Sequence, residues 1–188
     1  MYQSDICKEG KFMYDLFVLG QLMDESMSGY LMRQILQQIV GRQRKISFGM
    51  IYPLFKRLNE AGYITLDDRT DVGKRSKKVA TITDRGRTRF KELMVEKVPL
   101  NPNLEFTYSV KFRNFHLVEP KLRQEILNEY KDYLLENQES LHQQVIDMKK
   151  TPISAPDLEN AKWVISLKQV QMKAALQWVD SSLKKFTE

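Results

Sequence analysis

Residues 47–61 have the pattern of a short amphipathic helix, and any fold of this chain must bury one side of it. Apolar side chains recur at the spacing of a single helix face, at Ile51, Leu54, Phe55 and Leu58. Ser47 precedes the first turn and is a suitable N-cap. Gly62 follows the last turn, where helices commonly end. We therefore expect a helix with one buried face.

The other face of this segment is polar and basic, and it contains Tyr52, Lys56, Arg57 and Asn59. One interpretation is an ordinary surface helix with a solvated basic side. The alternative is a helix that contacts a negatively charged partner. The segments around it favour the second interpretation.

Two helical segments precede this helix. Residues 12–23 are mostly apolar, and residues 29–40 have an apolar inner face with Ser28 as the expected N-cap. Three helices joined by short turns are typical of helix-turn-helix modules. The expected fold class is therefore mainly α.

A β-hairpin is predicted directly after the third helix. Residues 63–66 and 77–83 are rich in β-branched residues, and a turn signal lies between them at residues 71–73. A fourth helix is expected up to about Val98. A basic hairpin after a basic helix is the pattern of a winged helix-turn-helix domain, which we assign to residues 1–98.

Positive charge is concentrated in the same region. The chain has a net charge of +6, whereas residues 42–91 alone contain fourteen basic and five acidic residues, a net charge of +9. A localised positive field suits nucleic acid or an anionic membrane surface. Chance clustering on a solvated face is the alternative. The combination of three helices, basic helix face and basic hairpin favours nucleic-acid binding.

Residues 99–103 contain two prolines and two asparagines and mark a boundary. The segment after it, residues 104–112, is ambiguous. Strict alternation of apolar and polar residues favours a strand, but several aromatic side chains also fit helical spacing.

Two long helices are predicted in the C-terminal half, at residues 119–149 and 157–186. Their apolar stripes are too wide to be covered by one neighbouring helix, so a partner is expected, and a symmetric homodimer is the simplest one. The alternative is that this half packs back onto residues 1–98. We assign residues 103–188 as a helical dimerisation domain, with contacts through Leu158, Ile165, Met172, Leu176, Val179 and Leu183.

Other classes of protein are less compatible with the sequence. Cys7 is the one cysteine, so no intramolecular disulfide can form, and neither a signal sequence nor a membrane span is predicted, which suggests a cytoplasmic protein. His116 and His142 are far apart, and no phosphate-binding loop or nucleophile motif is present. We expect no enzyme activity, no metal site and no cofactor.

The motifs of residues 19–87 resemble those of the PadR family of bacterial transcriptional regulators. These motifs are Ser28-Gly29-Tyr30-Leu31, a helix that begins Ser47-Phe48-Gly49-Met50-Ile51-Tyr52-Pro53-Leu54, the segment Ala61-Gly62-Tyr63-Ile64, and Ile82-Thr83-Asp84-Arg85-Gly86-Arg87. The resemblance implies a winged helix domain with a helical dimer arm. It also implies that residues 103–116 are helical, and we adopt that prediction over the strand.

Two positions depart from the family pattern. Many members have an aromatic residue at the position of Ala80. Many have a tryptophan at the position of Arg44. Pro53 lies inside the predicted third helix, where it removes the amide that would bond the Gly49 carbonyl, so we expect a kinked or loosened first turn.

The expected function is that of a sequence-specific DNA-binding regulator, a repressor that binds a palindromic operator as a homodimer. Amides at a helix N-terminus and basic side chains would contact phosphates. The predicted DNA-binding residues are Arg44, Lys45, Ser47, Phe48, Gly49, Tyr52, Lys56, Arg57, Lys74, Arg75, Lys77 and Lys78. The alternative is a protein-interaction scaffold whose basic face binds an acidic partner.

An effector site is a further hypothesis. Phe106, Tyr108, Phe112 and Trp163 are aromatic residues near the domain boundary or in the tail, and they form a candidate apolar pocket. An ordinary hydrophobic core is the alternative. The resemblance suggests a small aromatic effector such as a phenolic acid.

Overall fold

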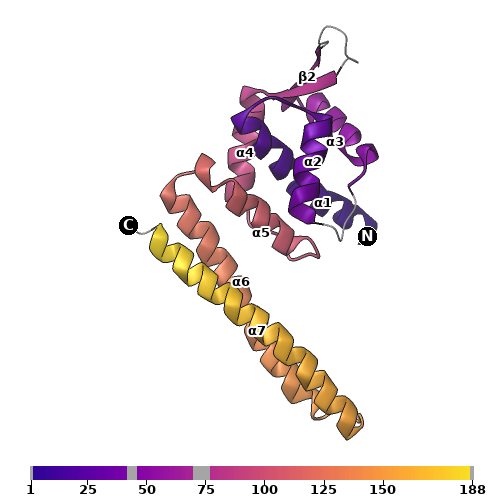
Figure 1. Cartoon of the computed structure of the whole chain (residues 1–188), viewed down its shortest axis with the longest axis vertical. Helices are drawn as coiled ribbons and strands as arrows, with labels where there is room; N and C mark the ends of the chain where they lie inside the picture. The colour runs from indigo at the N-terminus through magenta and orange to yellow at the C-terminus, as the bar shows by residue number, and fades with distance from the viewer. Residues whose placement is uncertain (1, 42–45, 70–76, 187–188) are drawn as a thin grey trace. The chain divides into compact units, whose positions relative to one another are not determined.

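The computed structural model describes the main chain of residues 2–41, 46–69 and 77–186 (Figure 1). Within these ranges the fold is mainly helical with one small antiparallel sheet, which confirms the predicted fold class. Its elements are α1 (Tyr2–Asp24), β1 (Met27–Ser28), α2 (Gly29–Val40), α3 (Phe48–Glu60), β2 (Ile64–Arg69), β3 (Lys77–Ile82), α4 (Asp84–Val95), α5 (Leu104–Arg113), the 3-10 helix η1 (Phe115–Leu117), α6 (Pro120–Met148) and α7 (Ala155–Lys185).

The chain divides into two compact units, Met1–Leu117 and Val118–Glu188. The sheet of the first unit has the strand order β1-β3-β2, and both pairs are antiparallel. β2 and β3 form the predicted hairpin. β1 was not predicted, because a two-residue strand is too short to show a period in sequence; it pairs Met27 with Ala80.

The ends of α2 and α3 are set by their flanking residues. The hydroxyl oxygen of Ser28 accepts a hydrogen bond from the Leu31 amide at 3.3 Å, which confirms the predicted N-cap of α2. Ser47 occupies the N-cap position of α3 in extended conformation, as predicted, but its side chain makes no cap hydrogen bond. Gly62 follows α3 with φ of 71°, a left-handed conformation that glycine adopts without strain.

The core of the first unit lies between α1 and the three helices α2, α3 and α4. Met13, Leu16 and Phe17 of α1 are fully buried, as are Leu58 of α3 and Phe90 of α4. α1 begins at Tyr2, ten residues before the predicted start, so Cys7 lies within a helix. The buried helix predicted at residues 12–23 is confirmed.

Residues 104–113 form a helix, α5, so the prediction taken from the family resemblance is confirmed and the strand reading is wrong. α5 packs on α1 in the first unit. Its Lys111 is fully buried and donates hydrogen bonds to the carbonyl oxygens of Met94 and Glu96, at 3.0 and 2.6 Å. These bonds link α5 to the C-terminal end of α4. The structural division therefore falls after Leu117, not at the predicted boundary of residues 99–103.

The second unit is a hairpin of two long helices, α6 and α7, which pack side by side (Figure 1). Ser154 caps α7 by accepting a hydrogen bond from the Asp157 amide at 3.3 Å. Lys131 of α6 pairs with Asp180 of α7 at 2.7 Å. No helix in the described part of the chain is both long and apolar enough to cross a membrane.

The residues of α7 that were predicted to contact a partner chain face α6 instead. Ile165 and Val179 are 4% and 0% exposed, and the other predicted dimer contacts, Leu158, Met172, Leu176 and Leu183, are half-buried. These side chains of α7 are covered because α6 of the same chain packs against them, antiparallel to α7. The exposed apolar side chains of α7 are different ones: Trp163, Val164, Leu167, Val170 and Trp178.

Candidate nucleic-acid interface

α3 presents the two faces that its sequence predicts. Ile51, Phe55 and Leu58 are at most 1% exposed and pack into the first unit. On the outer side Tyr52 is 48% exposed, and the Lys56 side chain is 78% exposed. Because a rigid core holds the inner face, the outer side chains project from a fixed helix.

A groove runs between the outer face of α3 and the hairpin. Tyr52 and Lys56 line it on the helix side, and Leu66 and Lys78 line it on the strand side. Lys78 is exposed, and in the antiparallel register of the hairpin it lies opposite Asp68 of β2. The complete lining is Tyr52, Pro53, Phe55, Lys56, Asn59, Glu60, Leu66 and Lys78. The groove thus brings two of the predicted cations, Lys56 and Lys78, to one surface.

Arg57 is directed away from this surface. Its Nη1 donates to Asp15 Oδ2 at 2.9 Å, and its Nη2 donates to Asp15 Oδ1. These hydrogen bonds raise the pKa of Arg57 above its ordinary value, against the opposing effect of burial. Glu60, three positions after Arg57, pairs with Lys56 at 3.8 Å. Of the two adjacent cations, therefore, Lys56 remains on the exposed face and Arg57 is tied to α1.

Ser47 and Gly49 are exposed at the start of α3. The helix continues without interruption through Pro53, so the predicted loosening does not break it. Pro53 itself is exposed and lines the groove. Gly49 is itself exposed, so water can hydrogen-bond to its carbonyl oxygen in place of the amide that Pro53 lacks.

Several predicted contacts lie outside the described residues: Arg44, Lys45, Lys74 and Arg75, together with the side chains of Phe48 and Lys77. Two residues that support α3 from behind were missed. Asp15 is the one acidic residue in the apolar stretch 12–23, which could have indicated a buried ion pair. Gly29 lies beneath Tyr52, since a Cβ built on it would be 3.6 Å from Tyr52 Cε1.

The predicted effector residues do not come together in one unit. In α5 the Tyr108 and Phe112 rings stack with centroids 5.9 Å apart, and Phe112 packs edge-on against Phe115 at 5.4 Å. Phe106 is half-buried in the same helix. Trp163 belongs to the second unit, where its side chain is 76% exposed and lines a shallow pocket on α7. No cluster of three or more potential metal ligands occurs among the described residues.

Residues 18–92 match the family model described as "Transcriptional regulator PadR-like family". The chain carries a PadR-like domain. The matched range extends from α1 to α4 and includes α3 and the hairpin. The family consists of transcriptional regulators, which confirms the prediction of a regulator rather than an enzyme.

A protein of Bacillus subtilis (strain 168), described as "Negative transcriptional regulator PadR", is 26% identical to the chain over 124 residues. The alignment covers 66% of this chain and 66% of that protein, slightly less than two thirds of its length.

Solved structures of Bacillus subtilis PadR are also similar to the chain. The complex with operator DNA is 20% identical with a TM-score of 0.44, and the match covers 92% of this chain and 98% of that one. The complex with p-coumaric acid is 19% identical with a TM-score of 0.40, and covers 95% of this chain and 97% of that one.

Proposed function

We propose that this protein is a sequence-specific DNA-binding repressor that acts as a homodimer on a palindromic operator. The observation that carries the proposal is the groove of the PadR-like domain, where Tyr52 and Lys56 of α3 are exposed opposite Lys78 of β3. The description of the Bacillus subtilis relative as a negative regulator supports repression.

The outer face of α3 suits the major groove of DNA, which admits one α-helix. Lys56 and Lys78 would contact phosphates, which supply affinity without sequence information. Tyr52 can donate its hydroxyl hydrogen to a phosphate, and Asn59 carries the amide that pairs with adenine in the major groove. Arg57 is left out of this contact set because Asp15 holds its guanidinium.

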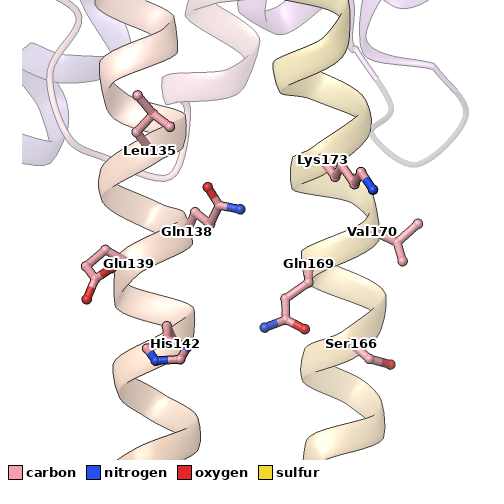
Figure 2. Close-up of a pocket in the computed structure, with 8 residues that line it drawn as sticks. All are labelled: Leu135, Gln138, Glu139, His142, Ser166, Gln169, Val170 and Lys173. Carbon is pink, nitrogen blue, oxygen red and sulfur yellow. The ribbon is translucent and has the colours of Figure 1, made fainter.

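The second unit supplies the surface for a dimer. Five large apolar side chains of α7 are exposed there, Trp163, Val164, Leu167, Val170 and Trp178. Exposed apolar patches of this kind are typical of protein interfaces. Beside them lies a groove between α6 and α7, with Glu139 and His142 on one helix and Lys173 on the other (Figure 2).

A second copy of the chain fits this surface by charge. In a two-fold interface the same patch meets itself. Lys173 of one copy can then face Glu139 of the other across the groove. A dimer of PadR-like domains places two recognition helices on half-sites about one DNA turn apart, roughly 34–36 Å.

Two further parts of the proposal are an aromatic effector and a cytoplasmic location. The effector part of the proposal rests on Phe112 of α5, which is half-buried and whose ring stacks on the buried Tyr108, as the contact for a small aromatic acid in the first unit. A location in the cytoplasm follows from the role of a regulator of genes.

The test is binding of the purified protein to fragments selected from genomic DNA, measured by fluorescence anisotropy over a range of salt. Lys56→Ala with Lys78→Ala is expected to weaken binding to all sequences and to reduce the salt dependence by about four counterions per dimer, two for each subunit. Lys121→Ala is the matched control. Lys121 has a side chain 89% exposed and an i,i+4 partner, Glu125, as Lys56 has Glu60.

Unchanged affinity and salt slope in the double variant would contradict the proposed interface. Failure to select any fragment, combined with retention of an acidic protein partner, would favour the interaction scaffold instead.

A further inference from the structure

The first turn of α3, the helix that carries the proposed DNA contacts, has few stabilising interactions of its own. Ser47 at its N-cap makes no side-chain cap hydrogen bond. Gly49 is a poor helix former, and Pro53 has no amide to donate to the Gly49 carbonyl oxygen. The Met50 amide donates to the Ser47 carbonyl oxygen at 3.2 Å, which is 3-10 rather than α spacing. The start of this helix therefore depends on support from another element.

α2 holds the residue that leads into this turn. The side-chain Oε1 of Gln37 accepts a hydrogen bond from the Ile46 amide at 2.8 Å. Nη1 of Arg33, one turn earlier in α2, donates to the Ile46 carbonyl oxygen at 3.3 Å. The Ile46 side chain is itself buried, with 1% exposed. Both backbone groups and the side chain of Ile46 are thus held in place directly before the N-cap residue of α3.

The side-chain amide of Gln37 makes hydrogen bonds with both of its polar atoms. While Oε1 accepts from Ile46, Nε2 donates to the carbonyl oxygen of Gly41, the C-cap residue of α2, at 2.7 Å. A primary amide can donate and accept in this way at one site, whereas a carboxylate only accepts. Gln37 is half-buried, so its bond to the Ile46 amide is partly shielded from water. One side chain therefore joins the end of α2 to the start of α3.

We propose that Gln37, supported by Arg33, is a positioning residue of the DNA interface: it sets the start of α3 by holding the Ile46 backbone and does not touch DNA itself. This inference rests on the proposed function, because α3 is the helix assigned to the major groove. Amides at a helix N-terminus are aimed at a phosphate only while the first turn is formed. When that turn opens, the fraction of protein that is competent to bind falls, and the apparent affinity falls with it.

Hydrogen exchange on the full chain, well below the unfolding temperature, tests the contact without DNA. Gln37→Met keeps an unbranched side chain with good helix propensity but removes the amide group. Protection of the Ile46 amide is expected to fall about 3- to 30-fold, with a smaller loss at Met50 and Ile51. Protection in α4 should stay unchanged, whereas a general loss of stability would lower protection in both helices.

Gln37→Glu separates the accepted hydrogen bond from the other properties of the side chain. The carboxylate still accepts from the Ile46 amide, but it cannot donate to Gly41. Protection of the Ile46 amide in this variant is expected to stay within about threefold of that in the unaltered protein. A loss as large as that in Gln37→Met would overturn the role of this hydrogen bond.

Fluorescence anisotropy with the selected DNA fragments measures the effect on binding. Gln37→Met is expected to weaken binding about two- to tenfold at every salt concentration. The salt slope should not change, because neither glutamine nor methionine is charged. Loss of a phosphate contact would reduce that slope, so the slope distinguishes a positioning residue from a contact residue. Unchanged affinity in Gln37→Met, with DNA that the unaltered protein binds, would overturn the proposal.

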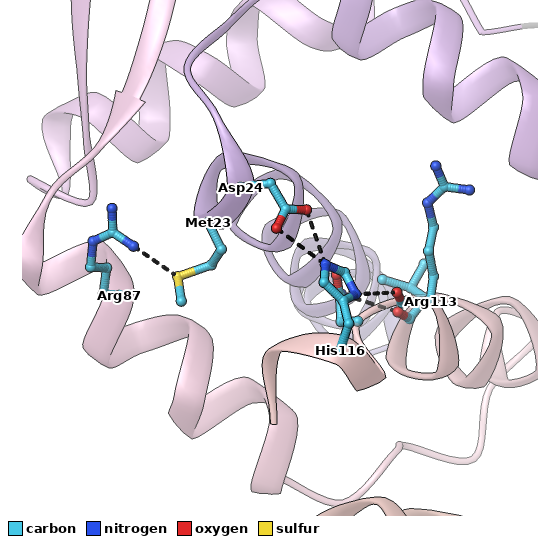
Figure 3. Close-up of polar contacts among 7 residues, drawn as sticks. Met23, Asp24, Arg87, Arg113 and His116 are labelled. Carbon is cyan, nitrogen blue, oxygen red and sulfur yellow. Dashed lines mark hydrogen bonds and ion pairs between the residues drawn. The ribbon is translucent and has the colours of Figure 1, made fainter. Parts of the chain in front are cut away.

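Two control variants should alter neither measurement. Gln38→Met makes the same substitution at the next position of α2, where the side chain is exposed. His116→Gln removes a contact between two other elements of the first unit, in which Nε2 of His116 lies 3.1 Å from both carboxylate oxygens of Asp24 (Figure 3). An equal loss of protection in α3 in either control would contradict a specific role of Gln37. If the unaltered protein binds no DNA, the proposed function fails, whereas the exchange measurements still decide whether Gln37 holds the start of α3.

Discussion

Arg57 of α3 and Asp15 of α1 form a two-pronged ion pair that joins helices 42 positions apart in sequence. The carboxylate is nearly buried, with 12% of its side chain exposed, and the guanidinium is 34% exposed. Paired, planar groups of this kind fix orientation as well as distance. The pair therefore reinforces the orientation of α3 on α1 that burial of Ile51, Phe55 and Leu58 sets.

Asp15→Asn is expected to lower the free energy of unfolding of the first unit by about 1–2 kcal/mol. The substitution leaves the guanidinium without its charged partner, and partial exposure of Arg57 limits the cost. Urea unfolding followed by circular dichroism measures it. Asp67→Asn, at an exposed position of β2, is the control and should change stability little. Equal effects of the two substitutions would contradict the orienting role.

Gly20→Ala is expected to destabilise the first unit by about 1–3 kcal/mol through overpacking. A Cβ at this position would lie 2.5 Å from both Oδ1 and Nδ2 of Asn114, whose side chain is 1% exposed and has no room to move outward. Adding Asn114→Ala should recover part of the loss, so the two substitutions should be non-additive.

Gly49→Ala provides the comparison, again by urea unfolding. The nearest atom to its Cβ is Ser47 Oγ at 3.6 Å, and the position is exposed in α3. Alanine should therefore raise stability, by up to about 1 kcal/mol, because glycine is the poorer helix former. A destabilisation at both glycines would point to a general intolerance of α1 and α3 rather than to the Asn114 contact.

Local patterns predicted most of the fold. α2, α3 and the β2–β3 hairpin each contain a full period of apolar residues and a stop signal, so their positions followed from the sequence. The side of α3 that faces outward followed in the same way, and Tyr52 and Lys56 are exposed as expected.

Contacts between distant segments could not be predicted in this way. The pairing of Arg57 with Asp15 instead of Glu60 depends on how α1 and α3 pack, which no local pattern contains. One apolar face of α7 was assigned to a partner chain, but its Ile165 and Val179 are buried in the hairpin. The spacing of apolar residues shows that a helix has an apolar face, and does not show which helix covers it.

Glu60→Gln is expected to tighten DNA binding about two- to fivefold while changing protein stability little. Glu60 pairs with Lys56 at 3.8 Å, and both side chains are mostly exposed, so the pair contributes little to folding. The carboxylate competes with phosphate for Lys56 and also adds negative charge to the groove. Anisotropy titrations at several salt concentrations measure the effect. Glu125→Gln removes the matched pair on α6 and should leave affinity unchanged, and a similar gain there would contradict the role of Glu60.

Leu167→Asp is expected to convert the proposed dimer to a monomer. Leu167 is 60% exposed within one chain, next to Trp163 and Val170 on α7. A carboxylate there remains solvated in the monomer, so the hairpin should fold normally. In a dimer it would be buried among apolar side chains without a partner, which costs several kcal/mol and dissociates the interface.

Sedimentation velocity over a range of protein concentrations measures the change. Asn128→Asp adds the same charge at an exposed position of α6 and should leave association unaltered. Ile165→Asp gives a different result, because Ile165 is 4% exposed and lies between α6 and α7, so the hairpin itself should lose helicity. If Leu167→Asp sediments like the unaltered protein at every concentration, this face of α7 is not the one that joins two copies.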